Sequence, residues 1–256
     1  MAKAVALTIA GSDSGGGAGL QADLKTFMAL DVFGTSVVTC ITAQNPERVL
    51  GVAPIDAQLI SLQLQAVCES FPVAAAKTGM LYSIPVIRAV ADALRSCPIP
   101  HLVVDPVMVS TSGAQLLRED AIEMLGQRIL KRATIITPNL DEAAILCGRP
   151  LDDLAAQEDA ARELAQRFAA AVLLKGGHRD GPAVVDVLAI DDKLHRLALP
   201  RVALPHPHGT GCTLSAALTA FLARGETLLQ AVTLAKRFVY ESLRRAAPVG
   251  QHYPLA

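Results

Sequence analysis

Short apolar runs rich in β-branched residues alternate along the chain with longer segments whose apolar positions recur every three or four residues. The short runs predict strands and the longer segments predict helices. The expected strands are AVALTIAG (4–11), TSVVTCIT (35–42), HLVVDPV (101–107), ATIITP (133–138) and AVLLKGG (171–177). The expected helices cover 20–30, 56–71, 114–131, 140–146 and 155–168. Uncharged strands that alternate with helices are typical of βαβ units, so we predict a mainly parallel sheet with helices on both faces.

The alternation changes near the end of the chain. In AVVDVLAIDDKLHRLAL (183–199), Asp191 and Asp192 separate two strand-like runs, which predicts a hairpin at an antiparallel edge of the sheet. Two helices follow, over 211–224 and 228–246, with Gly225 as the stop between them. Because no linker, repeat or low-complexity tract interrupts the pattern, we expect residues 1–256 to form a single domain.

Composition narrows the class of protein. The chain has 256 residues, of which 52% are hydrophobic, which is enough for a sizeable core and excludes disorder. The formal net charge is −1 and no basic stripe is present, which argues against nucleic acid as a partner. No apolar run approaches the ~20 residues that a membrane-spanning helix needs. The apolar run 4–10 is short and is followed at once by Asp13, so it predicts a first buried strand rather than a signal peptide.

The five cysteines are widely spread, odd in number and never in a CxxC pair. This usage disfavours zinc ribbons and disulfide frameworks and favours a reducing cytoplasm. Four of them lie among apolar neighbours, where we expect small buried hydrophobic side chains: Cys40, Cys68, Cys97 and Cys147. Cys212 differs because it lies in a glycine turn.

In open parallel sheets, ligands bind beyond the carboxyl ends of the strands, and the first strand is followed by GSDSGGGAGL (11–20). Five glycines between Gly11 and Gly19 allow close approach of backbone to a ligand, and bare N–H groups there could hold an anion. The segment lacks the Gly-Lys-Ser/Thr of a Walker loop, and Leu20 occupies the third glycine position of GxGxxG. A flexible tight turn is the alternative interpretation.

Three further strand ends are candidates for the site. Gln44 and Asn45 in TAQN have amides that donate and accept, which suits the edge of a heteroaromatic ring such as an aminopyrimidine, although a surface amide is an equal alternative. KTGML (77–81) and DPVM (105–108) close two more strands. Asp105 suits a metal site or a site that holds phosphate through water, with a helix cap as the alternative.

Two later segments extend the set of phosphate-side candidates. In TPNLDEA (137–143), Asn139 and Glu142 lie on one face of a first helical turn, where their oxygens could hold hydrated Mg²⁺. A capping box made by the same two residues explains the spacing equally well. Lys175 in LLKGGH (173–178) is placed to reach a nucleotide phosphate, and a solvated lysine is the alternative.

HPHGTGCTLSAAL (206–218) carries the most specific signal. Gly209, Thr210 and Gly211 expose successive backbone N–H groups, and Cys212 begins a helix whose dipole favours negative charge. Such a turn is suited to act as an anion hole for a phosphoryl group in transfer. A purely structural turn that leads into a closely packed helix is the alternative.

Together these segments resemble the hydroxymethylpyrimidine and phosphomethylpyrimidine kinases of thiamine biosynthesis, which belong to the ribokinase-like superfamily. The resemblance covers nearly the whole chain and is carried by ALTIAGSDSGGGAGLQADLKTF, TAQN, KTGML, DPVMVSTSG, TPNLDEA, LLKGGH and HGTGCTLSAAL. It implies a three-layer α/β/α sandwich, a homodimer, and ATP and Mg²⁺ as cofactors. The implied reaction is ATP-dependent phosphorylation of 4-amino-5-hydroxymethyl-2-methylpyrimidine and then of its monophosphate.

The resemblance also implies roles for single residues. Gln44 would contact the pyrimidine, with Gly11 and Met80 near the substrate and Asp23 as a further candidate on the substrate side. The residues implied for Mg²⁺ and the phosphates are Asp105, Asn139, Glu142 and Lys175. The turn at 209–211 would hold the oxyanion, and Cys212 would lie beside the acceptor. RVALPHPHGTGC (201–212) departs from the family pattern because it lacks the Asp and Asn often found before the turn.

A cysteine beside the acceptor is an unusual choice, since a thiol acts as a base only when ionised. Its unperturbed pKa is about 8.5, and we expect the helix N-terminus to lower the pKa of Cys212. A phosphate monoester carries roughly −1.5 to −2 charge at pH 7 and needs no base. We interpret Cys212 as a compromise between a base for the alcohol and an uncharged neighbour for the phosphate. Three other functions are alternatives to the one that the resemblance implies. They are a pyridoxal-type kinase, a non-catalytic nucleotide or vitamer sensor, and a nicotinamide dehydrogenase, which the failed GxGxxG match disfavours.

Overall fold

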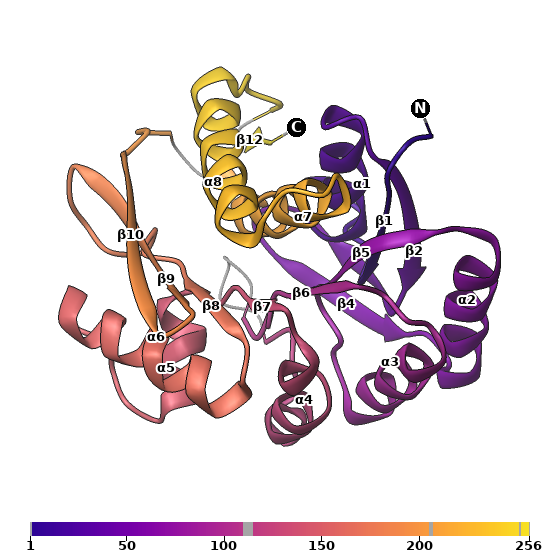
Figure 1. The fold of residues 1–256 in the computed structure, drawn as a ribbon. Helices are drawn as coiled ribbons and strands as arrows, with labels where there is room; N and C mark the ends of the chain where they lie inside the picture. The colour runs from indigo at the N-terminus through magenta and orange to yellow at the C-terminus, as the bar shows by residue number, and fades with distance from the viewer. Residues whose placement is uncertain (1, 110–114, 205–206, 251, 256) are drawn as a thin grey trace.

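The computed structural model describes residues 2–109, 115–204, 207–250 and 252–255. Its centre is an eight-stranded sheet with strand order β10-β9-β8-β7-β6-β5-β1-β2 (Figure 1). The sheet consists of β1 (Val5–Ala10), β2 (Phe33–Val38), β5 (Val73–Thr78), β6 (His101–Val104), β7 (Ile135–Ile136), β8 (Ala171–Leu174), β9 (Ala183–Ile190) and β10 (Lys193–Pro200). Neighbours from β8 to β2 are parallel, whereas β9 pairs antiparallel with both β8 and β10. The predicted mainly parallel sheet is confirmed.

Helices cover both faces of this sheet. They are α1 (Gly19–Ala29), α2 (Ala57–Ser70), α3 (Ile84–Ser96), α4 (Ile122–Arg128), α5 (Leu140–Cys147), α6 (Leu154–Phe168), α7 (Thr210–Ala223) and α8 (Leu228–Arg245). Helices α2 to α6 pack on one face, and α1, α7 and α8 pack on the other. Successive strand residues face opposite layers, so Val172 and Leu174 join one core while Leu173 joins the second. The result is the predicted three-layer α/β/α sandwich.

The hairpin of β9 and β10 forms the predicted antiparallel edge. Asp191 and Asp192 have φ angles of 49° and 59°, and Ile190 pairs with Lys193 across them. A two-residue turn with both residues in the left-handed region matches the twist of the strands that it joins, and aspartate tolerates this conformation. At the other predicted stop, Gly225 has a φ of 88° after α7. Local turn chemistry accounts for both features.

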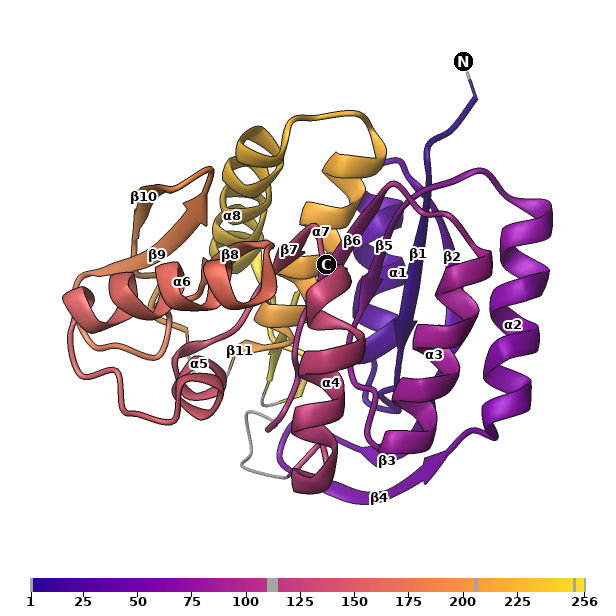
Figure 2. The same ribbon diagram turned by 60° about the horizontal axis from the view of Figure 1, so that its bottom comes forward.

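The run TSVVTCIT does not form one strand as predicted. Strand β2 ends at Val38, and the chain then leaves the sheet to form β3 (Cys40–Gln44), which pairs antiparallel with β4 (Val49–Pro54). Thr39 makes this corner, since its N–H donates to the Ala10 carbonyl at 3.0 Å and its hydroxyl donates to the Met80 carbonyl at 2.6 Å. Figure 2 shows the β3–β4 ribbon outside the eight-stranded sheet, at its lower end.

The predicted helix over 114–131 is also wrong in its first part. Within the described residues, helical structure begins with a 3₁₀ turn at Glu119–Ala121 and continues through α4 to a second turn at Leu130–Arg132. Leu116 and Leu117 are instead held by two hydrogen bonds from their backbone N–H groups to the Met108 carbonyl. Both leucines are buried although they lie outside a helix, and their apolar character made the segment resemble the buried face of a helix. Residues 110–114 of DPVMVSTSG and residues 205–206 before the glycine turn lie outside the described residues.

Two cysteines contradict the expectation of separate buried thiols. Cys68 in α2 and Cys97 after α3 form a disulfide, with their Cα atoms 5.8 Å apart. They are 29 residues apart in sequence, and the packing of α2 against α3 brings them together. Sequence spacing does not reveal this contact. Within the described residues, no helix is both long and apolar enough to cross a membrane.

Candidate active site

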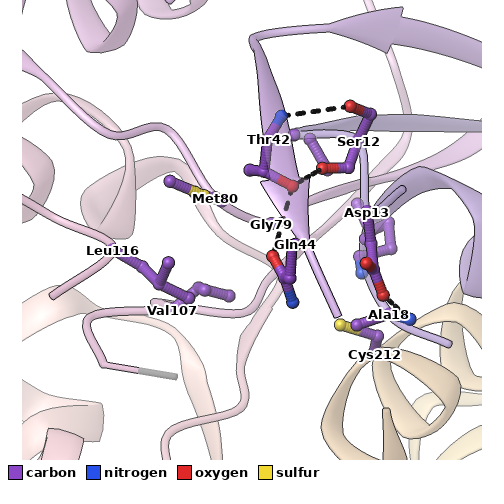
Figure 3. Close-up of a pocket in the computed structure, with 14 residues that line it drawn as sticks. Ser12, Asp13, Ala18, Thr42, Gln44, Gly79, Met80, Val107, Leu116 and Cys212 are labelled. Atoms are coloured by element: carbon purple, nitrogen blue, oxygen red, sulfur yellow. Dashed lines mark hydrogen bonds between the residues drawn. The ribbon is translucent and has the colours of Figure 1, made fainter. Parts of the chain in front are cut away.

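A cavity of about 60 Å³ lies at the carboxyl ends of β1, β3 and β5, beside the start of α7 (Figure 3). The predicted residues Gln44, Gly11, Met80 and Cys212 all line it, although they come from four separate segments of the chain. Strand ends therefore meet at one point, as expected for a parallel sheet.

One wall of the cavity is apolar. Met80, Val107 and Leu116 contribute it, and Figure 3 shows these side chains across the cavity from Cys212. Gly11 is required here by space, because a Cβ atom at this position would lie 2.6 Å from the Cys40 sulfur. This wall is suited to the face of a planar ring.

Gln44 supplies a polar group on the opposite side. Its backbone is fixed by Ser14, whose hydroxyl accepts from the Gln44 N–H at 2.8 Å and donates to the Gln44 carbonyl at 2.7 Å. Its side-chain oxygen receives a long hydrogen bond of 3.3 Å from Thr42. Asn45, by contrast, uses its side-chain oxygen to accept from the Glu47 and Arg48 N–H groups in the ribbon turn, which matches the surface alternative.

Three N–H groups of the glycine-rich turn after β1 are already bound to a side chain of the turn itself and are not free for a bound anion. The carboxylate of Asp13 accepts hydrogen bonds from the N–H groups of Gly15 at 2.8 Å, Gly17 at 3.1 Å and Ala18 at 2.8 Å. Burial opposes the charge of Asp13, but His208 and these N–H groups outweigh it and lower the pKa of the carboxyl. The turn therefore carries its own internal anion, and the tight-turn interpretation is the one that the geometry supports.

The second glycine turn is different because no side chain among the described residues accepts a hydrogen bond from its first N–H groups. Gly209 has a φ of 81° and begins the 14-residue helix α7 without a side-chain hydrogen bond to the first N–H groups. Its backbone is packed against the first turn, since a Cβ on Gly209 would lie 1.8 Å from the Gly17 carbonyl oxygen. Thr210 and Gly211 follow as the first helical residues. An uncapped helix N-terminus of this kind is suited to an anion.

Lys175 and Asp105 lie next to this turn. The Lys175 Nζ is 3.1 Å from one carboxylate oxygen of Asp105, and Ser215 of α7 donates to the other at 3.2 Å. A Cβ on Gly211 would stand 3.4 Å from the Lys175 Nζ and 3.8 Å from Asp105. The two predicted phosphate-side residues thus adjoin the glycine turn. Asp105 is 3% exposed and does not cap a helix.

Asn139 and Glu142 form the capping box that was the alternative to a metal site. The Asn139 side chain accepts from the Glu142 N–H, and Glu142 accepts from the Asn139 N–H, both at 2.8 Å. Burial and the nearby charge of Asp105 raise the pKa of Glu142, while Lys175 opposes the shift. Among the described residues, no group of three or more His, Cys, Asp or Glu side chains is arranged to hold a metal ion alone. A role in binding metal or nucleotide stays a prediction for this pair.

Cys212 lies at the boundary between the cavity and the glycine turn. Burial raises the pKa of its thiol to about 11, against the lowering influence of Lys77 and of the Gly19 N–H. The expectation that the helix N-terminus lowers this pKa is therefore wrong, because loss of hydration is the larger effect. The thiol is neutral at pH 7 in this structure.

Asp23 does not line the cavity and is fully buried beneath it. One carboxylate oxygen accepts from Thr8 at 2.6 Å and the other from Lys77 at 2.7 Å, so the residue has no oxygen directed at a substrate. The prediction of direct substrate contact is corrected accordingly. Lys77 does line the cavity and was missed by sequence reasoning. Its signal was a charged residue within the otherwise apolar strand β5.

The sandwich, the uncapped glycine turn and the adjoining lysine define a small-molecule kinase of the ribokinase-like class. A family model described as phosphomethylpyrimidine kinase matches residues 13–255, so the chain belongs to that family. A hydroxymethylpyrimidine/phosphomethylpyrimidine kinase from Rhizobium meliloti is 48% identical, over 95% of this chain and 91% of its own length.

Solved structures of two kinds resemble this one. The phosphomethylpyrimidine kinase of Clostridium difficile has a TM-score of 0.84 and 40% identity, covering 94% of this chain and 100% of that one. An ADP complex of Bacillus subtilis pyridoxal kinase has a TM-score of 0.90 and 36% identity, covering 98% of this chain and 95% of that one.

Proposed function

We propose that the chain transfers the γ-phosphoryl group of ATP to 4-amino-5-hydroxymethyl-2-methylpyrimidine, and then a second group to the resulting monophosphate. The observation that carries this proposal is the position of Cys212. On one side of its thiol is the cavity, which has an apolar wall and the Gln44 amide. On the other side is the glycine turn, which lies next to Lys175.

The cavity accounts for binding of the acceptor. Met80, Val107 and Leu116 would pack on the ring, and the Gln44 amide would pair with the aminopyrimidine edge, which presents both a donor and an acceptor. The 5-substituent would then face Cys212. The reacting oxygen is the alcohol in the first step and a phosphate oxygen in the second.

The glycine turn and Lys175 account for binding of the phosphoryl group. Phosphoryl transfer depends on positioning and on neutralisation of charge, which N–H groups at a helix start and an ammonium group both provide. Mg²⁺ in complex with ATP keeps most of its waters and needs one or two carboxylates. Asp105 and Glu142 fit this role because both are buried close enough for their charges to interact. When bound, the ion would neutralise phosphate charge, with Asn139 positioning Glu142.

The thiol explains how one site could serve two acceptors. A carboxylate about 4 Å from an anionic acceptor would cost on the order of 4 kcal/mol per unit charge at an effective dielectric constant of 20. A neutral thiol avoids this repulsion, and burial keeps the pKa of Cys212 at about 11. For the alcohol, the same sulfur would have to accept a proton, which needs a source of thiolate.

A second candidate is phosphorylation of pyridoxal. It is favoured by the solved structure named as a pyridoxal kinase, which is 36% identical to this chain. Pyridoxal also carries a ring with a hydroxymethyl group, so the apolar wall and Gln44 would accept it. Competition between pyridoxal and the pyrimidine alcohol for turnover distinguishes a side activity from the main one.

We further propose that residues 1–256 act as one kinase domain in a cytoplasmic homodimer. Leu59 and Leu62 on α2 and Leu50 on β4 are all at least half exposed, and exposed large apolar side chains support association of two copies. Light scattering during gel filtration tests the dimer. Because Cys68 and Cys97 form a disulfide, the cysteine usage of the chain no longer supports a reducing cytoplasm.

The test of the proposed function is an ATP-coupled assay with the pyrimidine alcohol and, separately, with its monophosphate. Anion-exchange chromatography separates monophosphate from diphosphate by charge. The proposal expects turnover of both acceptors, dependent on Mg²⁺. Release of ADP without either product would refute it.

A further inference from the structure

We propose that Lys77, held in place by Asp23, is the positive charge that stabilises the Cys212 thiolate before this thiolate takes the proton of the alcohol. Lys77 would be a positioning residue, since it acts through Cys212 and does not touch the substrate. The proposal rests on the proposed function, because it concerns the alcohol step of the same site.

The geometry begins with two elements that meet at the cavity. Helix α7 packs across β5, and Cys212 at the start of α7 lines the same cavity as Lys77 near the end of β5. The Lys77 Nζ is fully buried and makes one hydrogen bond within the described part of the chain, 2.7 Å long, to Asp23. An ammonium group has three donors, so two remain. Gly79 lines the cavity beside this ammonium group, and a Cβ there would stand in van der Waals contact with Nζ, at 3.8 Å.

Asp23 explains how a fully buried lysine keeps its charge. Burial is the largest single influence and lowers the pKa of Lys77, but Asp23, Cys212 and Asp105 together outweigh it and raise the pKa, with Asp23 contributing most. The second oxygen of Asp23 is held by the Thr8 hydroxyl at 2.6 Å, which fixes the carboxylate on the side away from the cavity. The pair therefore has an orientation, with its positive end at the cavity and its negative end beneath it.

The groups around Cys212 shift the pKa of its thiol in opposite directions and by different amounts. Burial raises the pKa of the thiol most, and Lys77 is the strongest opposing influence, ahead of Asp23 and Asp105, which raise it. The Gly19 N–H faces the sulfur from α1 and lowers the pKa further. Lys175 also interacts with the sulfur, although its hydrogen bond is to Asp105. Without Lys77, the main influences on the pKa of the Cys212 thiol would be burial and the carboxylates of Asp23 and Asp105, which all raise it.

The positive charge of Lys77 is needed in the first step, phosphorylation of the alcohol, because only this step releases a hydroxyl proton. As the alcohol oxygen bonds to the γ-phosphorus, the bond between that phosphorus and the leaving ADP oxygen breaks, and the hydroxyl proton moves to the Cys212 thiolate. The thiol then loses this proton to water before the next turnover. A phosphate monoester needs no base to attack. Lys77 should therefore matter more for the alcohol than for the monophosphate.

The competing explanation is a structural ion pair that only stabilises the fold. The decisive variant replaces both charges with groups of similar size, Lys77→Met/Asp23→Asn, so that no charge is left unpaired. The matched control is Lys236→Met/Asp186→Asn, which neutralises a second buried pair, 2.6 Å apart, between α8 and β9. Lys77→Gln/Asp23→Asn, which replaces the ion pair by two amides, takes the place of the first variant if that variant does not fold.

The first readout is alkylation of Cys212 by iodoacetamide at pH 9, followed by peptide mass spectrometry. Below the pKa of a thiol, the rate follows the thiolate fraction. We expect the rate for Cys212 to fall about fivefold or more in the Lys77 variants and to be unchanged in the Lys236 control, because each pKa unit is a factor of ten. An unchanged rate in both Lys77 variants would overturn the proposal.

The second readout is kcat/KM for the two acceptors. We expect the Lys77 variants to lose about tenfold or more with the alcohol, within the range that a positioned base provides, and to lose much less with the monophosphate. The Lys236 control should change both acceptors by the same factor. Equal losses in the Lys77 variants would assign the pair to the fold alone. If the unmodified protein turns over neither acceptor while the alkylation rate still falls, the proposed function fails and the link between Lys77 and Cys212 stands.

Discussion

The His208 Nε2 lies 3.2 Å from a carboxylate oxygen of Asp13, joining two glycine turns that are 195 residues apart in the chain. The same oxygen accepts from the N–H groups of Gly17 and Ala18 in the first turn, and His208 immediately precedes Gly209 in the second. One buried carboxylate therefore sets the position of both turns. This link makes the cavity wall and the phosphoryl turn a single unit.

Asp13→Asn should weaken both phosphorylation steps by similar factors and destabilise the fold by about 1–3 kcal/mol, since buried donors lose an ionised acceptor. Urea unfolding and kcat/KM with each acceptor measure the two effects. Asp31→Asn is the control, because its surface ion pair with Lys3 is exposed and should contribute little. A selective loss with one acceptor would contradict the idea that Asp13 positions both turns.

Asp13 also gives a pH dependence with a definite sign. Its pKa in the folded protein is lowered from 3.8, so its contribution to stability is present above about pH 3.8 and is lost as the pH falls toward the folded value. Asp23 and Glu142 have raised pKa values and act in the opposite direction. The difference in unfolding free energy between the protein and Asp13→Asn isolates the effect. That difference should shrink below pH 4, and a constant difference would contradict the assignment.

Gly209→Ala should abolish most turnover of both acceptors. The substitution combines a left-handed backbone, with φ of 81°, and a Cβ that would lie 1.8 Å from the Gly17 carbonyl oxygen. Gly250→Ala separates these causes, since its φ is 61° and no atom of the described residues lies within 4 Å of the added Cβ. We expect Gly250→Ala to cost about 1 kcal/mol of stability with unchanged kcat. Similar kinetics for the two variants would show that the Gly209 contact is unimportant.

Reduction of the Cys68–Cys97 disulfide should lower the unfolding temperature and leave kcat unchanged for both acceptors. Opening a loop of 29 residues removes about 3–4 kcal/mol in the chain-entropy account of disulfides. Calorimetry with and without reductant measures this, and Cys68→Ala/Cys97→Ala is the matched variant that reductant should not affect. A change in kcat on reduction would contradict a purely structural role.

The sequence was informative where structure depends on local chemistry. Asp191 and Asp192 identified the edge hairpin, and Gly225 identified the end of α7, because turn residues act through their own backbone. The glycine turn at 209–211 and the clustering of strand ends followed from the βαβ pattern, which brings carboxyl ends together.

The parts that could not be predicted depend on contacts distant in sequence. Thr39 turns β3 out of the sheet through bonds to Ala10 and Met80, which no local pattern reveals. Asp23 was expected at the substrate, and only the fold shows that Lys77 holds it below the cavity. The predicted shift in the pKa of Cys212 had the wrong direction. The sequence reveals that Cys212 lies at a helix N-terminus, but it does not reveal how far the thiol is removed from water.

The central claim is that one partly buried thiol serves an alcohol as base and tolerates a phosphate as neighbour. The ratio of kcat values for the two acceptors in Cys212→Ala and Cys212→Asp tests it most directly. Cys212→Ala should slow the alcohol step by about 10²-fold or more and the monophosphate step far less, whereas Cys212→Asp should selectively impair the monophosphate step. Equal losses with both acceptors in both variants would contradict the account.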